Sequence, residues 1–327
     1  ARSIVNRIWQ YHFGQGLAKT PNNFGATGGR PTHPALLDWL AVTLAEQGWS
    51  WKELHRLIMN SNAYCRRCEH PDMTDLIEKD PEQMAYAVFQ PRRLAAEELR
   101  DSMLLVSGEL NLERGGIPAR PELNLEAALQ PRQIMGTYAP AYQPSPLPAQ
   151  RHRRCVYALR IRGLRDPFME VFNQPGADMS CERRETSNVT PQVFALFNSE
   201  NSLDRSLAFA ARLLEAGSED DEVVRNAFRD AYGRAPDAEE LKASLAHWAE
   251  MTQRHELITF PKKEYPKTVE REAVDELSGE GFIFNEVLDV YEHFVPDLKR
   301  SEVGARTRGL AELCLVLFNS NEFIYVY

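Results

Sequence analysis

Seven prolines crowd the middle of this chain between Gly115 and Gln150, at positions 118, 121, 131, 140, 144, 146 and 148. Proline has no amide hydrogen to donate, and its ring fixes one backbone dihedral and clashes with the preceding helical turn. Neither a continuous helix nor a central strand can therefore run through this segment. We expect a long loop in the middle of the chain.

Helical patterns occupy the sequence before this loop. Residues 4–13 place apolar side chains at helical spacing, and glycines end the pattern. Pro34 opens the next helix as a first-turn proline. Ser50 and Glu53 predict a capping box, in which each side chain bonds the other residue's free amide, at the start of a helix over 51–60.

The sequence on either side of the loop also predicts further helices and one strand. A helix is expected over about 92–106. CVYALRI at 155–161 alternates between two faces, which is typical of a strand. A polar break at 215–222 precedes a helical hairpin, whose second helix is predicted to start at a capping box of Asp237 and Glu240.

These patterns predict a mainly α fold: an irregular helical domain with long proline-rich loops and at most a small β element. The polar break divides the chain in two. Residues 1–214 form a core with a helical N-terminal part, the proline-rich loop and an arginine belt. Residues 215–327 form a C-terminal helical part packed on that core.

Composition limits the class of protein. Apolar residues make up 43% and charged residues 26%, which is the profile of a globular protein in water. A net charge of −9 argues against nucleic-acid binding, which normally needs a basic field. No apolar run approaches the roughly 18 residues that a membrane span needs, and no signal peptide is visible.

Arginines form a positive belt within this acidic chain, ending in SCERRETSNVTPQVFALFNS at 180–199. Thr190 before Pro191 predicts a helix start with threonine as the cap. A helix N-terminus carries partial positive charge and free amides, so we expect an anion site beside it. Pairing of the arginines with internal carboxylates is the alternative. The predicted ligand-binding residues are Arg160, Arg162, Arg183, Arg184 and Thr190.

Three residues are weak candidates for catalysis. Glu97 and Asp101 share a face of the helix predicted over 92–106, together with Arg93. They are suited either to acid–base catalysis or to a structural ion-pair network with the neighbouring arginines. Cys181 is a candidate nucleophile, although no neighbouring histidine is visible to activate it.

Cys65, Cys68 and His70 come close to a cofactor motif. Covalent haem attachment needs C-x-x-C-H, and Glu69 displaces the histidine by one position. As metal ligands, the three residues lack a visible fourth partner. Free or disulfide-bonded cysteines are the alternative, and we expect no cofactor within this chain.

Several motifs follow one another in a fixed order: VNRIWQYHFGQGL, RPTHPALLDWLA, SWKELHRLI, RRLAAEELRDSM, SCERRETSNVTPQVFALFN and LCLVLFNSNEFIYVY. Together they resemble the planctomycete-type domain of unknown function number 1553, from about Ser3 to Tyr327. The resemblance implies a periplasmic or otherwise extracytoplasmic location in Planctomycetes or related bacteria. It also implies an upstream domain of unknown function number 1549 as a partner, and a c-type cytochrome domain, the carrier of any haem c, further upstream. It implies no activity.

Three functions fit this sequence. The first is a non-catalytic or accessory helical module of an exported multidomain protein, which binds partner domains or an anionic ligand. The second is a hydrolase or lyase that acts on anionic polysaccharide, with the arginines binding substrate. The third is a subunit of a c-type cytochrome electron-transfer protein. The lack of the common catalytic sequence templates favours the first.

Overall fold

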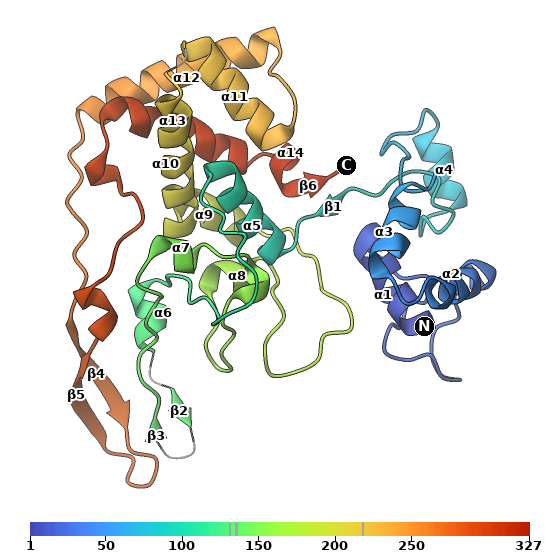
Figure 1. Ribbon diagram of the computed structural model, residues 1–327, viewed down its shortest axis with the longest axis horizontal. Coiled ribbons are helices and arrows are strands. Elements are labelled where there is room, and N and C mark those ends of the chain that lie inside the picture. Colours follow the sequence, from blue (N-terminus) through green and yellow to red (C-terminus); the bar gives the residue numbers. More distant parts are fainter. Residues whose placement is uncertain (131, 135–136, 218) are drawn as a thin grey trace. The chain divides into compact units, whose positions relative to one another are not determined.

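The structure, a computed structural model, is mainly α-helical, as the sequence predicts (Figure 1). It describes residues 1–130, 132–134, 137–217 and 219–327. Over these residues it has 14 α-helices, which make up 48% of the structure, and a few short antiparallel strands, which make up 8%. No helix in the described part of the chain is both long and apolar enough to span a membrane.

The chain folds into two compact units. The first contains residues 1–93, 180–184 and 325–327, and the second contains residues 94–179 and 185–324. Two short segments from the C-terminal half therefore join the N-terminal residues in the first unit. The boundary predicted at residue 214 lies within the second unit, near the end of a long helix.

The first unit contains four α-helices and one pair of short antiparallel strands. These are α1 (Arg2–Phe13), α2 (Pro34–Glu46), α3 (Trp51–Met59), α4 (Met73–Lys79), β1 (Arg92–Arg93) and β6 (Tyr325–Val326). The apolar faces of α1, α2 and α3 meet in one core around Val5, Leu37 and Leu54. α1 ends as expected at Gly14, whose φ of 75° lies in the left-handed region that glycine tolerates best.

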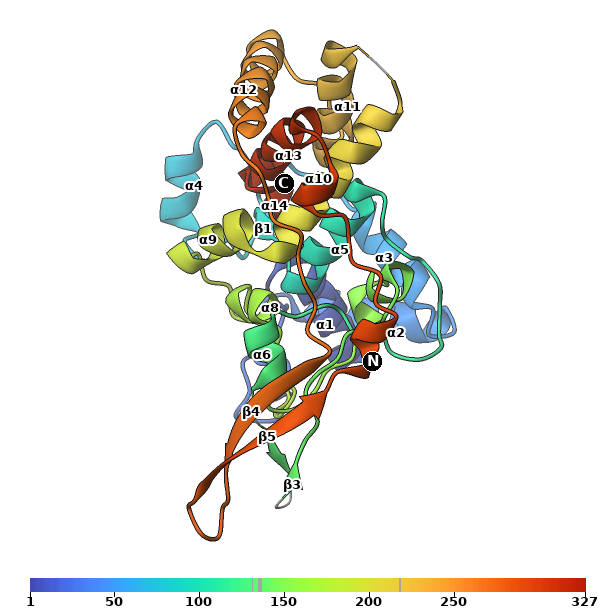
Figure 2. The ribbon, with the colours of Figure 1, turned by 90° about the vertical axis from the view of Figure 1, so that its left-hand side faces the viewer.

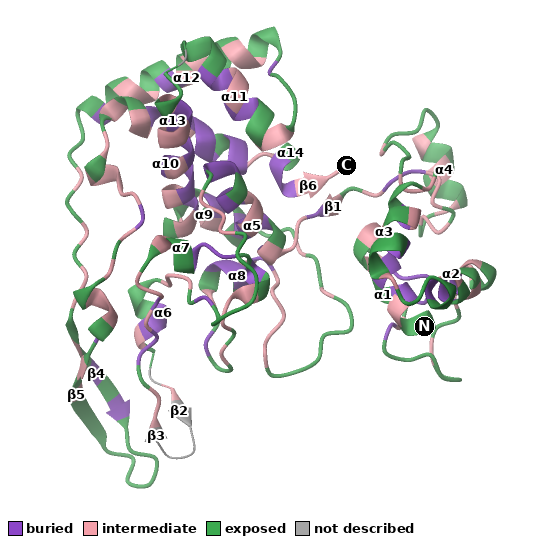
Figure 3. Ribbon diagram, in the orientation of Figure 1, coloured by how far each residue is buried: buried purple, intermediate pink, exposed green. Residues whose placement is uncertain are grey.

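Among its described residues, the second unit contains the remaining helices, three 3₁₀ turns and two pairs of antiparallel strands. In chain order these are α5 (Ala96–Ser107), α6 (Leu125–Leu129), β2 (Gln133–Ile134), β3 (Thr137–Tyr138), α7 (Pro148–Arg151), η1 (Cys155–Tyr157), α8 (Pro167–Val171), α9 (Thr190–Asn198), α10 (Glu200–Glu215), α11 (Asp220–Tyr232), α12 (Ala238–Glu256), β4 (Thr268–Val274), β5 (Gly281–Val287), η2 (Asp289–Glu292), η3 (Arg300–Glu302), α13 (Ala305–Phe318) and α14 (Asn321–Ile324). Buried residues concentrate on α10 and α13 (Figure 3). There, Phe209 and Phe318 are both fully buried and stack with ring centroids 5.9 Å apart.

Of the two predicted capping boxes, one forms completely and the other in part. At α12 the Asp237 carboxylate accepts a bond from the Glu240 amide at 2.8 Å, and the Asp237 amide donates back to Glu240 at 2.8 Å, which confirms that capping box. At α3, Ser50 accepts from the Glu53 amide at 3.5 Å, but the Glu53 carboxylate pairs with Arg56. An ion pair on the helix surface therefore replaces the second half of this box.

The strand predicted over residues 155–161 is wrong. The segment begins with the 3₁₀ turn η1, and only isolated bridges follow it. The Cys155 amide donates to the Asp101 carboxylate at 2.8 Å, and the Tyr157 amide turns back to the carbonyl of Arg154 at 2.9 Å. These bonds take amides that a strand would donate to a neighbouring strand.

The longest strands, β4 and β5, form a hairpin that the sequence analysis missed. They pair from Thr268 opposite Val287 to Val274 opposite Gly281, and the hairpin extends away from the helices of its unit (Figures 1 and 2). Its alternation is hidden because a buried position carries a charged residue, Arg271, which pairs with a glutamate of β5. The proline-rich segment contains no long helix or strand among its described residues, as predicted, but only the short α6, β2 and β3 and the start of α7. Three of its residues (131, 135 and 136) lie outside the described ones.

Candidate functional site

The second unit contains a cavity of about 290 Å³ whose wall is rich in charged side chains. Several separate parts of the chain meet there: α5, the residues before α6, the end of α7, the start of α8, the α9–α10 junction, and the segment before η3. The charged, imidazole and amide side chains of the wall belong to Arg100, Glu122, Asn124, Arg151, His152, Asp166, Asn198, Glu200, Asn201, Asp204, Arg205 and Asp297. We call this space the charged cavity.

Arg100 brings a buried positive charge to the charged cavity from the buried face of α5. Its guanidinium donates to the carbonyls of Arg153 at 3.3 Å and Arg151 at 2.9 Å, and to the sulfur of Cys155 at 3.5 Å. Among the described residues, its one ion pair is a loose one with Asp101, at 3.9 Å. Arg100 is therefore a buried cation that lacks a hydrogen-bonded carboxylate.

Asp297 is the centre of an ion-pair network in the wall. Its carboxylate accepts bonds from Arg151 at 2.5 Å, from Nε2 of His152 at 2.9 Å, and from Arg205. All four residues are buried. Burial raises the pKa of Asp297, but the bond from His152 and the two guanidiniums outweigh burial and hold this pKa well below its usual range. Asp297 is therefore ionised, and it fixes both arginines in the wall.

Two further carboxyl groups of this network take up protons in the mildly acidic range. Glu109 accepts a bond from Arg205 at 2.8 Å, and Asp204 accepts one from Lys299 at 2.5 Å. Burial raises the pKa of each carboxyl group to about 6, and the cations only partly offset this. Burial also lowers the pKa of His152 to about 4, so its imidazole is neutral at pH 7.

Asp166 lies between the charged cavity and a smaller one of about 80 Å³, and it lines both. Its Oδ1 accepts bonds from the amides of Phe168 at 2.9 Å and Met169 at 3.4 Å, so the side chain caps α8. Burial raises the pKa of this carboxyl group. Pro121 and Leu123 also line both spaces, so the two cavities are neighbours.

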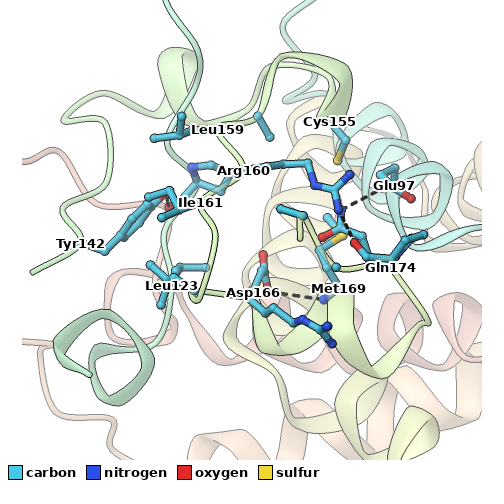
Figure 4. A pocket seen from close by; sticks show the side chains of 17 residues that line it. Glu97, Leu123, Tyr142, Cys155, Leu159, Arg160, Ile161, Asp166, Met169 and Gln174 are labelled. Carbon is cyan, nitrogen blue, oxygen red and sulfur yellow. Dashed lines mark hydrogen bonds between the residues drawn. The ribbon is translucent and has the colours of Figure 1, made fainter. Parts of the chain in front are cut away.

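The smaller space, which we call the small cavity, has a polar side and an apolar side. Glu97 and Gln174 lie on one side and Tyr142 lies on the other (Figure 4). Gln174 donates to the Glu97 carboxylate at 3.1 Å. Arg160 also lines this space and donates to the carbonyl of Pro175. The small cavity thus contains both a held carboxylate and a guanidinium.

Some donors in the wall of the charged cavity have no acceptor. Nδ2 of Asn201 is buried and has no hydrogen-bond partner among the described residues, and the same holds for Nε of Arg205. Unpaired donors also occur away from this cavity, at Nε of Arg153 and Arg308 and at Nε2 of Gln90. What distinguishes Asn201 is its place in the cavity wall, beside the unpaired Nε atoms of Arg151 and Arg205. A buried polar group without a partner costs about 1–3 kcal/mol. A ligand rich in acceptors would remove this cost.

The predicted ligand-binding residues are spread over both units. Arg160 lines the small cavity, whereas Arg162 is exposed and lines neither cavity. Arg183 and Arg184 belong to the first unit, and an anion clamp that combines all four arginines stays a prediction. Thr190 is the first residue of α9, and the side chain of the residue before it makes no cap bond. The prediction of Thr190 as the helix cap is therefore wrong.

The weak catalytic candidates have different surroundings. Glu97 lines the small cavity, whereas Asp101 lines neither cavity and binds the Cys155 amide. Arg93, which was expected on the same helical face, lies before α5 in β1. Cys181 is an exposed free thiol of the first unit. Catalytic roles for Glu97, Asp101 and Cys181 stay predictions.

Cys65 and Cys68 are free thiols rather than a disulfide. Burial and the neighbouring Glu69 raise the pKa of Cys68, which disfavours the thiolate form that binds metals. His70 accepts a bond from the amide of Asp72 at 3.1 Å. Within the described residues, no group of three or more His, Cys, Asp or Glu side chains is arranged to hold a metal ion.

The central residues of the charged cavity were not predicted from the sequence. The sequence pattern could have pointed to Arg205, because this residue falls on the buried face of α10 with Ser202 and Phe209. A charged residue within such a face needs a partner. The role of Asp297 could not be predicted from its neighbours in the sequence, because its partners Arg205 and Arg151 lie 92 and 146 positions away.

Comparison with known proteins points to one family. No curated protein and no solved structure matches the chain. The model of the family PSD1, described as a protein of unknown function (DUF1553), matches residues 1–248. The match covers well over half of the chain and every residue of the charged cavity except Asp297. As the sequence motifs predict, the chain therefore belongs to the PSD1 (DUF1553) family.

Proposed function

We propose that the second unit binds a small acidic ligand with hydroxyl groups, namely a sugar acid, in the charged cavity. One observation carries this proposal: the wall combines a buried Arg100 that lacks a hydrogen-bonded carboxylate with an unpaired amide donor at Asn201. The volume of about 290 Å³ is at the lower end of the range for ligand pockets, roughly 300–1,000 Å³.

The chemistry of the wall favours a hydroxylated acid over a simple anion. The guanidinium of Arg100 is buried and its ion pair with Asp101 is a loose one, and a ligand carboxylate can accept two parallel bonds from this guanidinium. Hydroxyl groups both donate and accept, so they can donate to Asp166 and Asp204 and accept from Asn201. A ligand with one carboxylate and several hydroxyl groups therefore matches the donors and acceptors together.

A binding role agrees with the accessory module that the sequence favours. The proposal includes an extracytoplasmic location and the upstream partner domains, which the family resemblance supports. A hydrolase or lyase acting on acidic polysaccharide is the second candidate, because burial raises the pKa of Asp166 and brings that of Asp204 to about 6. Such carboxyl groups can act as general acids near neutral pH. No specific observation favours the cytochrome alternative.

Isothermal titration calorimetry with D-galacturonate, D-glucuronate and D-mannuronate tests the proposal. D-Galactose is the control ligand for galacturonate, since it has the same ring with a hydroxymethyl group in place of the carboxylate. We expect saturable binding of at least one acid, and at least tenfold weaker binding of its neutral counterpart. Failure of all three acids to bind, or equal binding of galactose, would contradict the proposal.

Asn201→Asp is the variant that tests the location. It adds a negative charge to the wall with almost no change in shape, and it lies in the first turn of α10, where an acidic residue suits the helix dipole. We expect the fold to persist and the acid to bind at least tenfold more weakly. Asn226→Asp on α11, outside the cavity, is the matched control and should bind normally. Full affinity in Asn201→Asp would place the ligand elsewhere.

A further inference from the structure

We infer that the ligand of the charged cavity continues into the small cavity, so that it is a linear chain of acidic sugars rather than a single sugar. This inference rests on the proposed function. Its basis is the boundary between the two spaces, where Pro121, Leu123 and Asp166 line both. A ligand that fills the charged cavity up to this boundary is therefore adjacent to the small cavity.

Asp166 is suited to bind the junction between two neighbouring sugars of the ligand. Its Oδ1 is held by the amides of Phe168 and Met169, which fixes the carboxyl group at the boundary. Its Oδ2 makes no hydrogen bond among the described residues, so it can accept one from a ligand hydroxyl group at the boundary that Asp166 lines. The two amide bonds that hold Asp166 at the start of α8 thus position one acceptor where two neighbouring sugars would meet.

The small cavity has a guanidinium that can bind the carboxylate of the second sugar residue. Arg160 is exposed, and its guanidinium donates a hydrogen bond to the carbonyl of Pro175. Among the described residues no carboxylate pairs with it, whereas the neighbouring Arg165 pairs with Glu170 at 2.7 Å. Arg160 therefore has guanidinium donors left for an incoming carboxylate.

The size of the small cavity decides which part of the second sugar residue enters it. A space of about 80 Å³ is too small for a sugar ring, but it accommodates a carboxylate. The sugar ring would stay outside this space, and only its carboxylate would enter between the polar side and the apolar wall that Leu159, Ile161 and Tyr142 line. The two cavities together thus favour a ligand in which each sugar carries an acidic group.

Calorimetry with galacturonate and its α-1,4-linked dimer, digalacturonate, tests this inference. We expect the dimer to bind wild-type protein at least tenfold more tightly than the monomer. Arg160→Met should remove most of this gain and leave monomer affinity unchanged. Arg162→Met is the matched control, because Arg162 is also exposed but lines neither cavity, and it should retain the gain.

The outcomes separate the two proposals. Equal binding of monomer and dimer, or equal weakening of both by Arg160→Met, overturns the inference and leaves the proposed function standing. Loss of the gain in Arg162→Met as well would show a general charge effect, which also overturns it. Absence of binding by monomer, dimer and the other two acids overturns the proposed function, and the inference with it.

Discussion

Replacing Asp297 with alanine removes the acceptor that joins three distant parts of the second unit. The carboxylate bonds Arg151 at 2.5 Å, His152 at 2.9 Å and Arg205, all of them buried. After the substitution, Arg205 keeps its ion pair with Glu109 at 2.8 Å. Among the described residues, Arg151 keeps backbone carbonyls and the ring of Phe294, 4.4 Å from its guanidinium carbon, but no carboxylate. One buried guanidinium therefore loses its compensating charge.

The magnitude follows from this loss. Removing one partner of a buried ion pair costs about 3–5 kcal/mol, because the other charge stays buried and unpaired. Urea denaturation at pH 7, followed by circular dichroism, should show the unfolding free energy of Asp297→Ala lowered by about this amount. Asp297→Asn keeps one acceptor oxygen and should lose less. Glu250→Gln, which breaks an exposed pair with Arg254, is the control and should cost less than about 1 kcal/mol. A loss below about 1 kcal/mol for Asp297→Ala would refute the reasoning.

Three further predictions concern a helix cap, pH dependence and the cysteines. Asp237→Ala removes the cap of α12 and should lower the unfolding free energy by about 0.5–2 kcal/mol in urea, and an unchanged midpoint would contradict this. The pKa of Asp204 is raised to about 6, so its contribution to stability is fully present below the unfolded value of about 3.9 and is lost as the pH rises through 6. Asp204→Asn should therefore flatten the fall in stability between pH 4 and 6.5, and an identical pH profile for the two proteins would argue against it. Maleimide should label the exposed thiols of the native protein but leave the buried Cys155 and Cys314, whose pKa values burial raises. Mass spectrometry that finds either of these labelled before unfolding would contradict their burial.

Local signals predicted several helix ends correctly. Gly14 ends α1, Pro34 opens α2 and Asp237 caps α12, because each acts through backbone groups within a few residues. The segment at 155–161 shows the limit of such signals. Its strand-like alternation is overridden by a carboxylate 54 positions earlier in the sequence, that of Asp101.

The site could be predicted only in part, for the same reason. Glu97 and Arg160 were candidates from the sequence, and both line the small cavity. Arg100 was visible only as a possible partner for neighbouring acids, because nothing local shows that its side chain is buried against backbone carbonyls of residues 151 and 153. The charged cavity exists because distant segments bring their charges together, and a single sequence does not reveal that arrangement.

A crystal structure of the protein soaked with D-galacturonate tests the central claim most directly. The sugar is expected in the charged cavity, with its carboxylate about 3 Å from the guanidinium of Arg100 and an oxygen within hydrogen-bonding distance of Nδ2 of Asn201. A sugar bound at another place, or one whose carboxylate points away from Arg100, would contradict it.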